Sequence, residues 1–381
     1  MSGLRADGHS KVDPEGLAEF SVVFTDRSLN HMSQKFQQVM RDISDIAREV
    51  YNAQAVALVP GGGTYAMEAV ARQFARESDA LIVRNGLFSF RWSQIIEAAG
   101  FDGTAIVQPA RPEGNAPRPA YAPPPIEDVV AEIRRARPSV VFAPHVETAA
   151  GLILPDDYIA ALAAAVHEHD GLMVLDCIAS GTIWVDMQAL GVDVLISAPQ
   201  KGWSAPPSAG MVMFSARGAE RLAATSSDSF ALDLKKWRAI MQAYEDGGHA
   251  YHATMPTDAL LTLRDAMVET RQMGFEAARA AQWDLGRKVR AVLAERGFAS
   301  VAAEGFGAPG VVVSYTDDPD IRSGRKFVEQ GVQIAAGVPL QVGEGQDFST
   351  FRLGLFGLDK LKDVDGTVAR LTRALDAVAE G

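Results

Sequence analysis

The sequence is nearly free of cysteine, since Cys177 is the single thiol in 381 residues. One thiol excludes an intramolecular disulfide and any metal cage built from cysteines. Basic residues are outnumbered, and the net charge of −12 argues against a nucleic-acid partner because phosphate binding needs a basic surface. No apolar run reaches the length of about 20 residues that spans a membrane, and the polar N-terminus lacks the apolar core of a signal peptide. We therefore expect a cytoplasmic protein that binds neither nucleic acid nor a membrane.

The chain instead shows an alternation of helical and strand-like segments. Short continuous apolar runs separated by amphipathic segments are typical of a mostly parallel sheet covered by helices, so the expected fold class is α/β. The predicted strands are residues 54–59, 80–84, 104–107, 139–143, 172–176, 192–196 and 208–214. The predicted helices are residues 30–51, with an apolar stripe from Met32 to Val50, and residues 65–76, 87–99, 126–136 and 156–169.

The last third of the chain has a different pattern. Residues 257–296 read as one long helix or a broken pair that leads away from the sheet. Strand-like runs at 310–315 and 348–353, with helices near 319–330 and 359–379, indicate a small α+β domain. We divide the chain into an N-terminal arm (1–29), a large domain (30–256), and a connecting helix with a small C-terminal domain (257–381).

One lysine stands between two predicted strands. Lys201 follows the apolar run 192–196 and precedes the run 208–214. Burial between strands lowers the pKa of an amine and makes it a nucleophile, so Lys201 is a candidate to hold an aldehyde cofactor as a Schiff base. The alternative is a lysine in a surface loop.

A glycine-rich turn, Gly61-Gly62-Gly63-Thr64, joins a predicted strand to a helix. Glycines let the backbone approach an anion, and a helix N-terminus offers free N–H groups. The spacing fits neither the dinucleotide fingerprint nor the Walker motif. Anion binding is the interpretation we favour, and a tight strand-to-helix connection is the alternative.

Two carboxylates follow buried strands. Asp176 ends an apolar strand, where it needs a cationic partner such as a protonated pyridine nitrogen, or else acts as a helix or turn cap. His145, Glu147 and Thr148 follow the strand 139–143 and reach the same sheet edge. The spacing of His145 and Glu147 does not fit zinc, so no metal site is expected.

Arg352, on an apolar strand, suits a carboxylate ligand or a structural ion pair.

These motifs, in this order, resemble the class V aminotransferases, which are fold-type I enzymes that depend on pyridoxal phosphate. The nearest subgroup is the alanine–glyoxylate and serine–pyruvate aminotransferases, and the resemblance covers roughly residues 30–360. It implies that Lys201 forms the internal aldimine and that Asp176 pairs with the pyridine nitrogen. It also implies that Phe88 stacks on the cofactor ring and that Thr148 binds the ring oxygen.

The resemblance implies further contacts at the two ends of the ligands. The phosphate would be held by Gly62, Gly63, Thr64 and Gln200, and across a homodimer interface by Tyr251 and Thr254. Arg352 would bind the substrate carboxylate. The active sites would then be shared between two subunits.

The expected reaction is transfer of an amino group from a small amino acid, alanine- or serine-like, to a small 2-oxo acid, glyoxylate or pyruvate. The alternatives are a pyridoxal-phosphate lyase acting on an amino acid and a non-catalytic ligand-binding α/β protein. A cysteine desulfurase is disfavoured because Cys177 follows a strand end and is not on a mobile loop. Residues 20–28 lack the proline–glycine-rich substrate loop of the family, so the resemblance leaves the substrate open.

Overall fold

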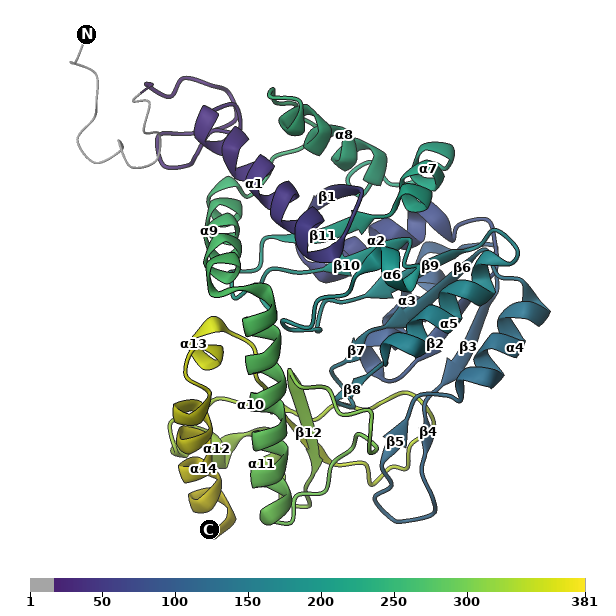
Figure 1. Cartoon of the computed structure of the whole chain (residues 1–381), viewed down its shortest axis with the longest axis vertical. Helices are drawn as coiled ribbons and strands as arrows, with labels where there is room; N and C mark the ends of the chain where they lie inside the picture. Colours follow the sequence, from purple (N-terminus) through teal and green to yellow (C-terminus); the bar gives the residue numbers. More distant parts are fainter. Residues whose placement is uncertain (1–16, 381) are drawn as a thin grey trace.

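The computed structural model describes residues 17–380, and its centre is a seven-stranded sheet (Figure 1). The strands follow the order β1-β11-β10-β9-β6-β2-β3. Neighbours from β10 to β3 run parallel, whereas β11 runs antiparallel to both β1 and β10, which confirms the predicted α/β class. The bounds are β1 (Ala55–Pro60), β2 (Ala80–Arg84), β3 (Ala105–Pro109), β6 (Val140–Pro144), β9 (Leu172–Asp176), β10 (Val194–Ser197) and β11 (Ala209–Phe214).

The direction of each connection explains why helices cover both faces of the sheet. The connections that contain α2 and α3 lead to a strand nearer the β3 side of the sheet. Those that contain α4, α5 and α6 lead to a strand nearer the β1 side. Because parallel crossovers are right-handed, opposite directions put these two groups on opposite faces (Figure 1). Every residue of β6, β9 and β10 is therefore buried. The helices are α2 (Gly63–Phe74), α3 (Leu87–Ala99), α4 (Ile126–Ala136), α5 (Asp156–His167) and α6 (Met187–Leu190).

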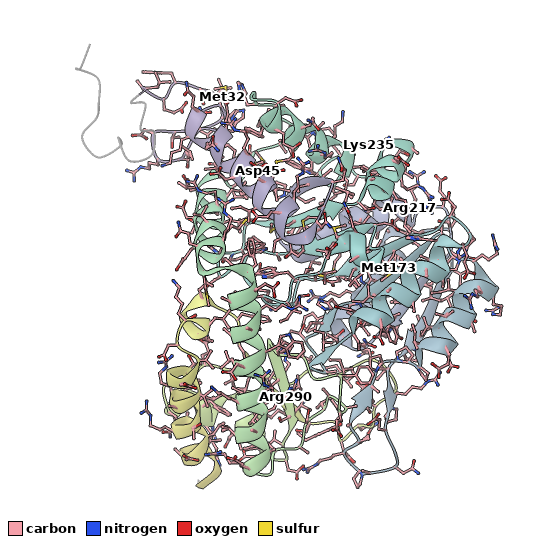
Figure 2. All side chains as sticks on the ribbon, viewed as in Figure 1. Met32, Asp45, Met173, Arg217, Lys235 and Arg290 are labelled. Carbon is pink, nitrogen blue, oxygen red and sulfur yellow. The ribbon has the colours of Figure 1, made fainter. Side chains whose placement is uncertain are left out.

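The first helix starts later than the sequence predicts. α1 (Gln34–Tyr51) is capped by Ser33, whose Oγ accepts a hydrogen bond of 3.1 Å from the N–H of Phe36. Met32 therefore precedes the helix and is 41% exposed, so its place in the apolar stripe was wrong (Figure 2). α1 packs against α8 (Leu234–Glu245) and α9 (Thr257–Met273). Of the proposed N-terminal arm, residues 1–16 lie outside the described residues.

The long helical segment is a broken pair. α9 ends at Gly274, whose φ of 91° is open to glycine and strained for other residues, and α10 (Phe275–Glu295) begins directly after it. α10 carries the chain away from the large sheet (Figure 1). None of the helices within residues 17–380 is long and apolar enough to cross a membrane.

The C-terminal part has a sheet of its own. Its three strands follow the order β12-β14-β13 and pair antiparallel. The predicted helix at 359–379 is two helices, and the predicted strand 348–353 lies slightly later. The elements are β12 (Val311–Tyr315), β13 (Ala335–Ala336), β14 (Thr350–Gly354), α11 (Pro319–Ser323), α12 (Arg325–Glu329), α13 (Leu358–Leu361) and α14 (Val364–Glu380). The exact division at residue 256 remains a prediction.

Arg290 joins this C-terminal part to the large domain. It projects from α10, where it is labelled in Figure 2. Its Nη2 donates to the carbonyl oxygens of Gly151, Ala308 and Val311 at 3.3, 2.8 and 3.2 Å. Burial lowers the pKa of Arg290 to about 10, still above neutral pH, so the guanidinium stays charged. The turn that ends at Gly151 is thereby held from the side of α10.

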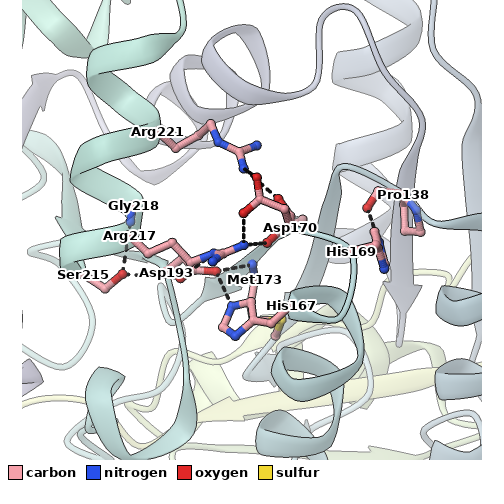
Figure 3. A network of polar contacts seen from close by, with 11 residues as sticks. Pro138, His167, His169, Asp170, Met173, Asp193, Ser215, Arg217, Gly218 and Arg221 are labelled. Atoms are coloured by element: carbon pink, nitrogen blue, oxygen red, sulfur yellow. Dashed lines mark hydrogen bonds and ion pairs between the residues drawn. The ribbon is translucent and has the colours of Figure 1, made fainter.

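At the amino end of the central strand β10, one buried carboxylate connects several elements (Figure 3). Asp193 precedes β10 and is 2% exposed. Its Oδ2 accepts 2.8 Å hydrogen bonds from Nε2 of His167 and from the N–H of Met173, and its Oδ1 accepts a longer one from Ser215. These contacts tie α5, β9 and the start of α7 (Ala216–Ala224) to β10.

We predict that Asp193→Ala lowers the free energy of unfolding by about 2–4 kcal/mol, because it leaves the N–H of Met173 buried without its acceptor. The control is Asp170→Ala in the same network. Asp170 pairs with Arg217 and Arg221 at the surface, with a side chain 78% exposed, so its loss should change the free energy by less than about 1 kcal/mol. Urea unfolding of both variants measures the difference, and equal losses would contradict the structural role of Asp193.

Candidate active site

The carboxyl ends of the parallel strands open into one cavity of about 180 Å³. It lies beside the N-terminus of α2, the end of β9 and the loop between β10 and β11. The structure brings together most of the site residues predicted from the sequence. Those in the cavity wall are Gly63, Thr64, Phe88, Thr148, Asp176, Gln200 and Lys201, and the other wall residues are Met67, Arg91, Val146, Ile178 and Ala179.

Lys201 lies in the loop between two strands that are themselves buried. Burial lowers the pKa of its amine, and the nearby guanidinium groups of Arg352 and Arg91 lower it further. No carboxylate forms an ion pair with Lys201 among the described residues, and its Nζ lies 5.1 Å from the ring centre of Phe356. The population of neutral, nucleophilic amine is therefore larger than for an exposed lysine.

Asp176 is the last residue of β9 and is also buried. Burial raises the pKa of its carboxyl group to about 7, and the charge of Glu147 adds to the rise, while Arg91 opposes it. Its Oδ1 accepts a 2.9 Å hydrogen bond from the N–H of Ile178. No cation within residues 17–380 pairs with it. A buried carboxylate without a cationic partner fits a protonated ring nitrogen, so this site suits a pyridine cofactor.

The glycine-rich turn forms a cradle at the start of α2. The N–H groups of Gly63 and Thr64 are the first of the helix and have no acceptor within it. A Cβ on Gly63 would lie 2.5 Å from Cδ1 of Ile178, and the φ of Gly61 is +124°, a conformation that suits glycine. The backbone is therefore bare and positively polarised where an anion such as a phosphate would lie.

Phe88 is held in the cavity wall through Glu147, a residue whose part the sequence did not reveal. The Glu147 carboxylate is fully buried and accepts hydrogen bonds from the N–H groups of Phe88, Ser89 and Ala149 at 3.2, 2.9 and 2.9 Å. The Ser89 hydroxyl donates a fourth at 2.7 Å. A Cβ on Gly86 would lie 2.7 Å from Cγ of Glu147, so only glycine fits there. Glu147 thus fixes α3 against the turn that carries Thr148.

His145 belongs to the same turn but lies outside the cavity wall. Its Nδ1 is 2.7 Å from the Ser180 hydroxyl. Burial lowers the pKa of the imidazole to about 3, so His145 is neutral at ordinary pH. It is a buried hydrogen-bonded residue that takes no part in the wall around Lys201.

Two arginines approach the ring of Phe88, and the sequence drew attention to only one of them. The Cζ of Arg352 lies 5.6 Å from the ring centre, and its Nε donates to Ala336 O at 2.8 Å. Arg91, which the sequence analysis missed, has its Cζ 4.7 Å from the same ring and donates to Oγ1 of Thr64 at 3.0 Å. Among the described residues neither arginine is ion-paired. Arg91 lies three residues after Phe88 on helix α3, and residues at this spacing lie on the same face of a helix. That spacing was the signal that could have identified Arg91 as a neighbour of Phe88.

Three predicted phosphate ligands are not in this cavity wall within one chain: Gly62, which caps α2 directly before Gly63, and the more distant Tyr251 and Thr254. Tyr251 is 54% exposed, and its hydroxyl lies 3.1 Å from that of Thr254. The Tyr251 ring contacts His31 at 5.5 Å between ring centres. Neither Tyr251 nor Thr254 lines the wall around Lys201.

Comparison with known proteins agrees with this geometry. Residues 19–337 match the model of the family described as aminotransferase class V. The chain belongs to this family. Class V aminotransferases are enzymes that use pyridoxal 5′-phosphate, which accords with the paired features of Lys201 and Asp176.

Individual relatives of this class V aminotransferase are distant. It is 28% identical to the 2-aminoethylphosphonate–pyruvate transaminase of Salmonella paratyphi B, over 89% of this chain and 88% of that one. Its fold superimposes on an alanine–glyoxylate aminotransferase from Nostoc sp. with a TM-score of 0.77 and 22% identity, covering 91% and 88% of the two chains.

A further relative has an unrelated name. The chain is 26% identical to a Synechococcus protein named soluble hydrogenase, small subunit, over 91% of this chain and 87% of that one. That name does not transfer to the present aminotransferase, because a single cysteine cannot supply the thiolate ligands of an iron–sulfur cluster.

We predict that the cofactor-free aminotransferase loses stability as pH rises from about 4 to about 7. The folded-state pKa of Asp176 is raised from 3.8 to about 7, so unfolding releases a proton in this window, and the folded state carries the full penalty above it. The loss attributable to Asp176 should be roughly 2–4 kcal/mol, and Asp176→Asn should remove it.

Denaturant unfolding of the cofactor-free protein at a series of pH values measures this loss. Asp102→Asn, which changes an exposed aspartate, serves as the control and should follow the wild-type curve. Parallel curves for wild type and Asp176→Asn would contradict the prediction.

Proposed function

We propose that this aminotransferase holds its cofactor covalently through Nζ of Lys201 and moves an amino group from an alanine- or serine-like amino acid to glyoxylate or pyruvate. The observation that carries the proposal is the pair Lys201 and Asp176 in one cavity wall. The pKa of the amine is lowered and the pKa of the carboxyl group is raised, and neither has an ion-pair partner among the described residues. These are the two groups that a pyridine aldehyde requires.

The remaining wall residues supply binding and orientation. Pyridoxal phosphate, when bound, supplies an electron sink. Asp176 accepts a hydrogen bond from the protonated ring nitrogen, and Phe88 stacks on the ring, supported from below by Glu147. Thr148 donates to the ring oxygen.

The phosphate and carboxylate ends of the ligands have separate partners. Gly62, Gly63, Thr64 and Gln200 bind the phosphate at the start of α2. Arg352 would bind the substrate α-carboxylate with its planar fork, since no carboxylate within residues 17–380 forms an ion pair with it.

Lys201 also moves the proton. Once the amino substrate has displaced Nζ of Lys201 from the cofactor, the freed amine would accept the proton from the substrate α-carbon and later return it to the adjoining carbon of the cofactor. Burial and the nearby guanidinium groups of Arg352 and Arg91 lower the pKa of the Lys201 amine, which enlarges the fraction of unprotonated Nζ available for this step. Arg352 orients the α-carbon toward Nζ by anchoring the carboxylate.

The single cysteine supports transfer of an amino group over desulfuration. Cys177 is 3% exposed, and burial raises the pKa of its thiol well above the ordinary value. A buried thiol in its protonated form does not act as a mobile sulfur nucleophile. The names of relatives, a 2-aminoethylphosphonate–pyruvate transaminase and an alanine–glyoxylate aminotransferase, support the choice of a small 2-oxo acid as acceptor.

We predict that purified wild-type protein takes up pyridoxal phosphate with a visible absorbance band, which alanine or serine converts to that of the amino form. Lys201→Ala should lose the covalent band and about 10²–10⁴-fold in kcat/KM, because the base for the α-proton is gone. Lys360→Ala, a change of a surface lysine paired with Asp359, is the control and should behave as wild type.

Absence of any cofactor uptake by wild type would exclude the proposal. A band that no amino donor converts would exclude transamination in favour of a lyase.

We further propose that two copies form a homodimer and that Tyr251 and Thr254 of the partner subunit complete each phosphate site. Two neighbouring surface segments expose large apolar side chains, including Phe20 at 91% and Phe230 at 78%. Clusters of this kind mark interaction surfaces. His252, the residue after Tyr251, contacts the Phe230 ring at 4.8 Å between ring centres, and neither Tyr251 nor Thr254 lines the cavity of its own chain. A cytoplasmic location remains part of this proposal.

We predict a dimer in analytical ultracentrifugation, and a loss of about tenfold in pyridoxal-phosphate affinity for Tyr251→Phe, which removes one hydrogen bond to the phosphate. Co-expression of Lys201→Ala with Tyr251→Phe offers the sharper test. In a mixed dimer the one site that keeps Lys201 also receives the native Tyr251 from its partner, so that site, half of the dimer's two, should bind as wild type. A monomer that binds the cofactor with full affinity would refute shared sites.

A further inference from the structure

Arg91 has no carboxylate partner among the described residues of a chain whose net charge is −12. Arg84 and Arg352 nearby also have no ion pair within residues 17–380, whereas several other arginines are neutralised. On α2, for example, Arg72 pairs with Glu68 at 2.8 Å and with Asp228 at 3.0 Å. Arg91 instead has a hydroxyl and an aromatic ring as neighbours, although acidic residues are abundant. An unpaired guanidinium in a cavity wall indicates that its counter-ion is a ligand.

The position of Arg91 points to one end of the cofactor. Its Nη1 donates to Oγ1 of Thr64 at 3.0 Å, and its Cζ lies 4.7 Å from the ring centre of Phe88. Thr64 is a proposed phosphate ligand, and Phe88 is the proposed partner of the pyridine ring. The guanidinium therefore lies at the proposed phosphate end of the cavity, where it is hydrogen-bonded to Thr64 of the cradle.

The charge of the proposed phosphate site leaves a role for this cation. A phosphate monoester carries about −1.5 to −2 charges at neutral pH. Gly62, Gly63, Thr64 and Gln200 are all uncharged, and the helix N-terminus contributes only about half a positive charge. Lys201 is committed to the covalent bond and Arg352 to the substrate carboxylate. Arg91 is the remaining cation of the cavity wall.

We propose that Arg91 binds the phosphate group of the cofactor through its guanidinium fork and supplies the positive charge that the glycine cradle lacks. This inference rests on the proposed function and adds a ligand to it. The same chemistry would also suit a phosphonate or a second carboxylate on a substrate. We assign the cofactor's phosphate because Arg91 is bonded to Thr64 in the cradle.

The test compares ligands with and without phosphate on cofactor-free protein. Wild type, Arg91→Gln, Arg91→Lys and the control Arg72→Gln are titrated with pyridoxal phosphate and with pyridoxal, following the absorbance of the bound aldehyde. Arg91→Gln should weaken pyridoxal phosphate about 10- to 100-fold and change pyridoxal less than about twofold. Arg91→Lys should lie between wild type and Arg91→Gln, because a point charge replaces the fork. Arg72→Gln should match wild type.

Inorganic phosphate gives a second readout that needs neither catalysis nor the aldehyde. Phosphate should raise the melting temperature of cofactor-free wild type and of Arg72→Gln, because a ligand that binds only the folded state stabilises it. The rise should be absent in Arg91→Gln. If Arg91→Gln fails to fold, the titrations of Arg91→Lys with the two aldehydes decide alone.

Several results would overturn the proposal. Equal losses for pyridoxal phosphate and pyridoxal would make Arg91 a structural or ring-stacking residue. Unchanged affinity for both, with a raised KM confined to acidic substrates, would assign Arg91 to a distal acidic group of the substrate. Failure of the proposed function has a different signature, since wild type would then bind neither aldehyde.

Discussion

Burial at the carboxyl edge of the parallel strands is the constraint on which the site depends. The same exclusion of water lowers the pKa of Lys201 and raises that of Asp176, so both groups shift toward their neutral forms. A salt bridge between them would have cancelled both effects, and none forms. The sheet thus presents an amine and a carboxyl group separately to one cavity. Two buried ionisable groups without partners are unfavourable in the empty cavity. A pyridine aldehyde would make the arrangement favourable, because its aldehyde reacts with the amine and its basic ring nitrogen pairs with the carboxyl group.

One further carboxylate, that of Glu147, makes the cavity rigid, because its oxygens accept hydrogen bonds from groups of the protein itself. Its hydrogen bonds to Phe88, Ser89 and Ala149 join α3 to the turn behind β6. Arg290 holds the end of that turn from α10. Phe88 and the turn that carries Thr148 are therefore positioned from two parts of the fold, which leaves these walls of the proposed site little freedom before a cofactor binds.

Much of this architecture could be predicted from the sequence, because buried parallel strands leave continuous apolar runs. The runs ending at Asp176 and before Lys201 located two groups at one edge. The antiparallel direction of β11 could not be predicted, since a continuous apolar run does not indicate which way a strand runs in the sheet. Glu147 was expected at this edge, but its support of Phe88 was not predicted, and Arg91 was not singled out at all, because Phe88 and Thr64, their respective partners, belong to other elements. Met32 fitted a helical period but precedes the capping residue.

The pairing of β1 with β11 also governs when the enzyme can first acquire its cofactor. β1 is made early, yet its only neighbour in the sheet arrives with Ala209–Phe214, and the arginine of β14 comes later still. Until then β1 is an edge strand without a partner, exposed to mispairing as the chain leaves the ribosome. Capture of pyridoxal phosphate is therefore a property of the finished chain. A prematurely terminated product would carry Lys201 but would not withdraw the cofactor from the cell's supply.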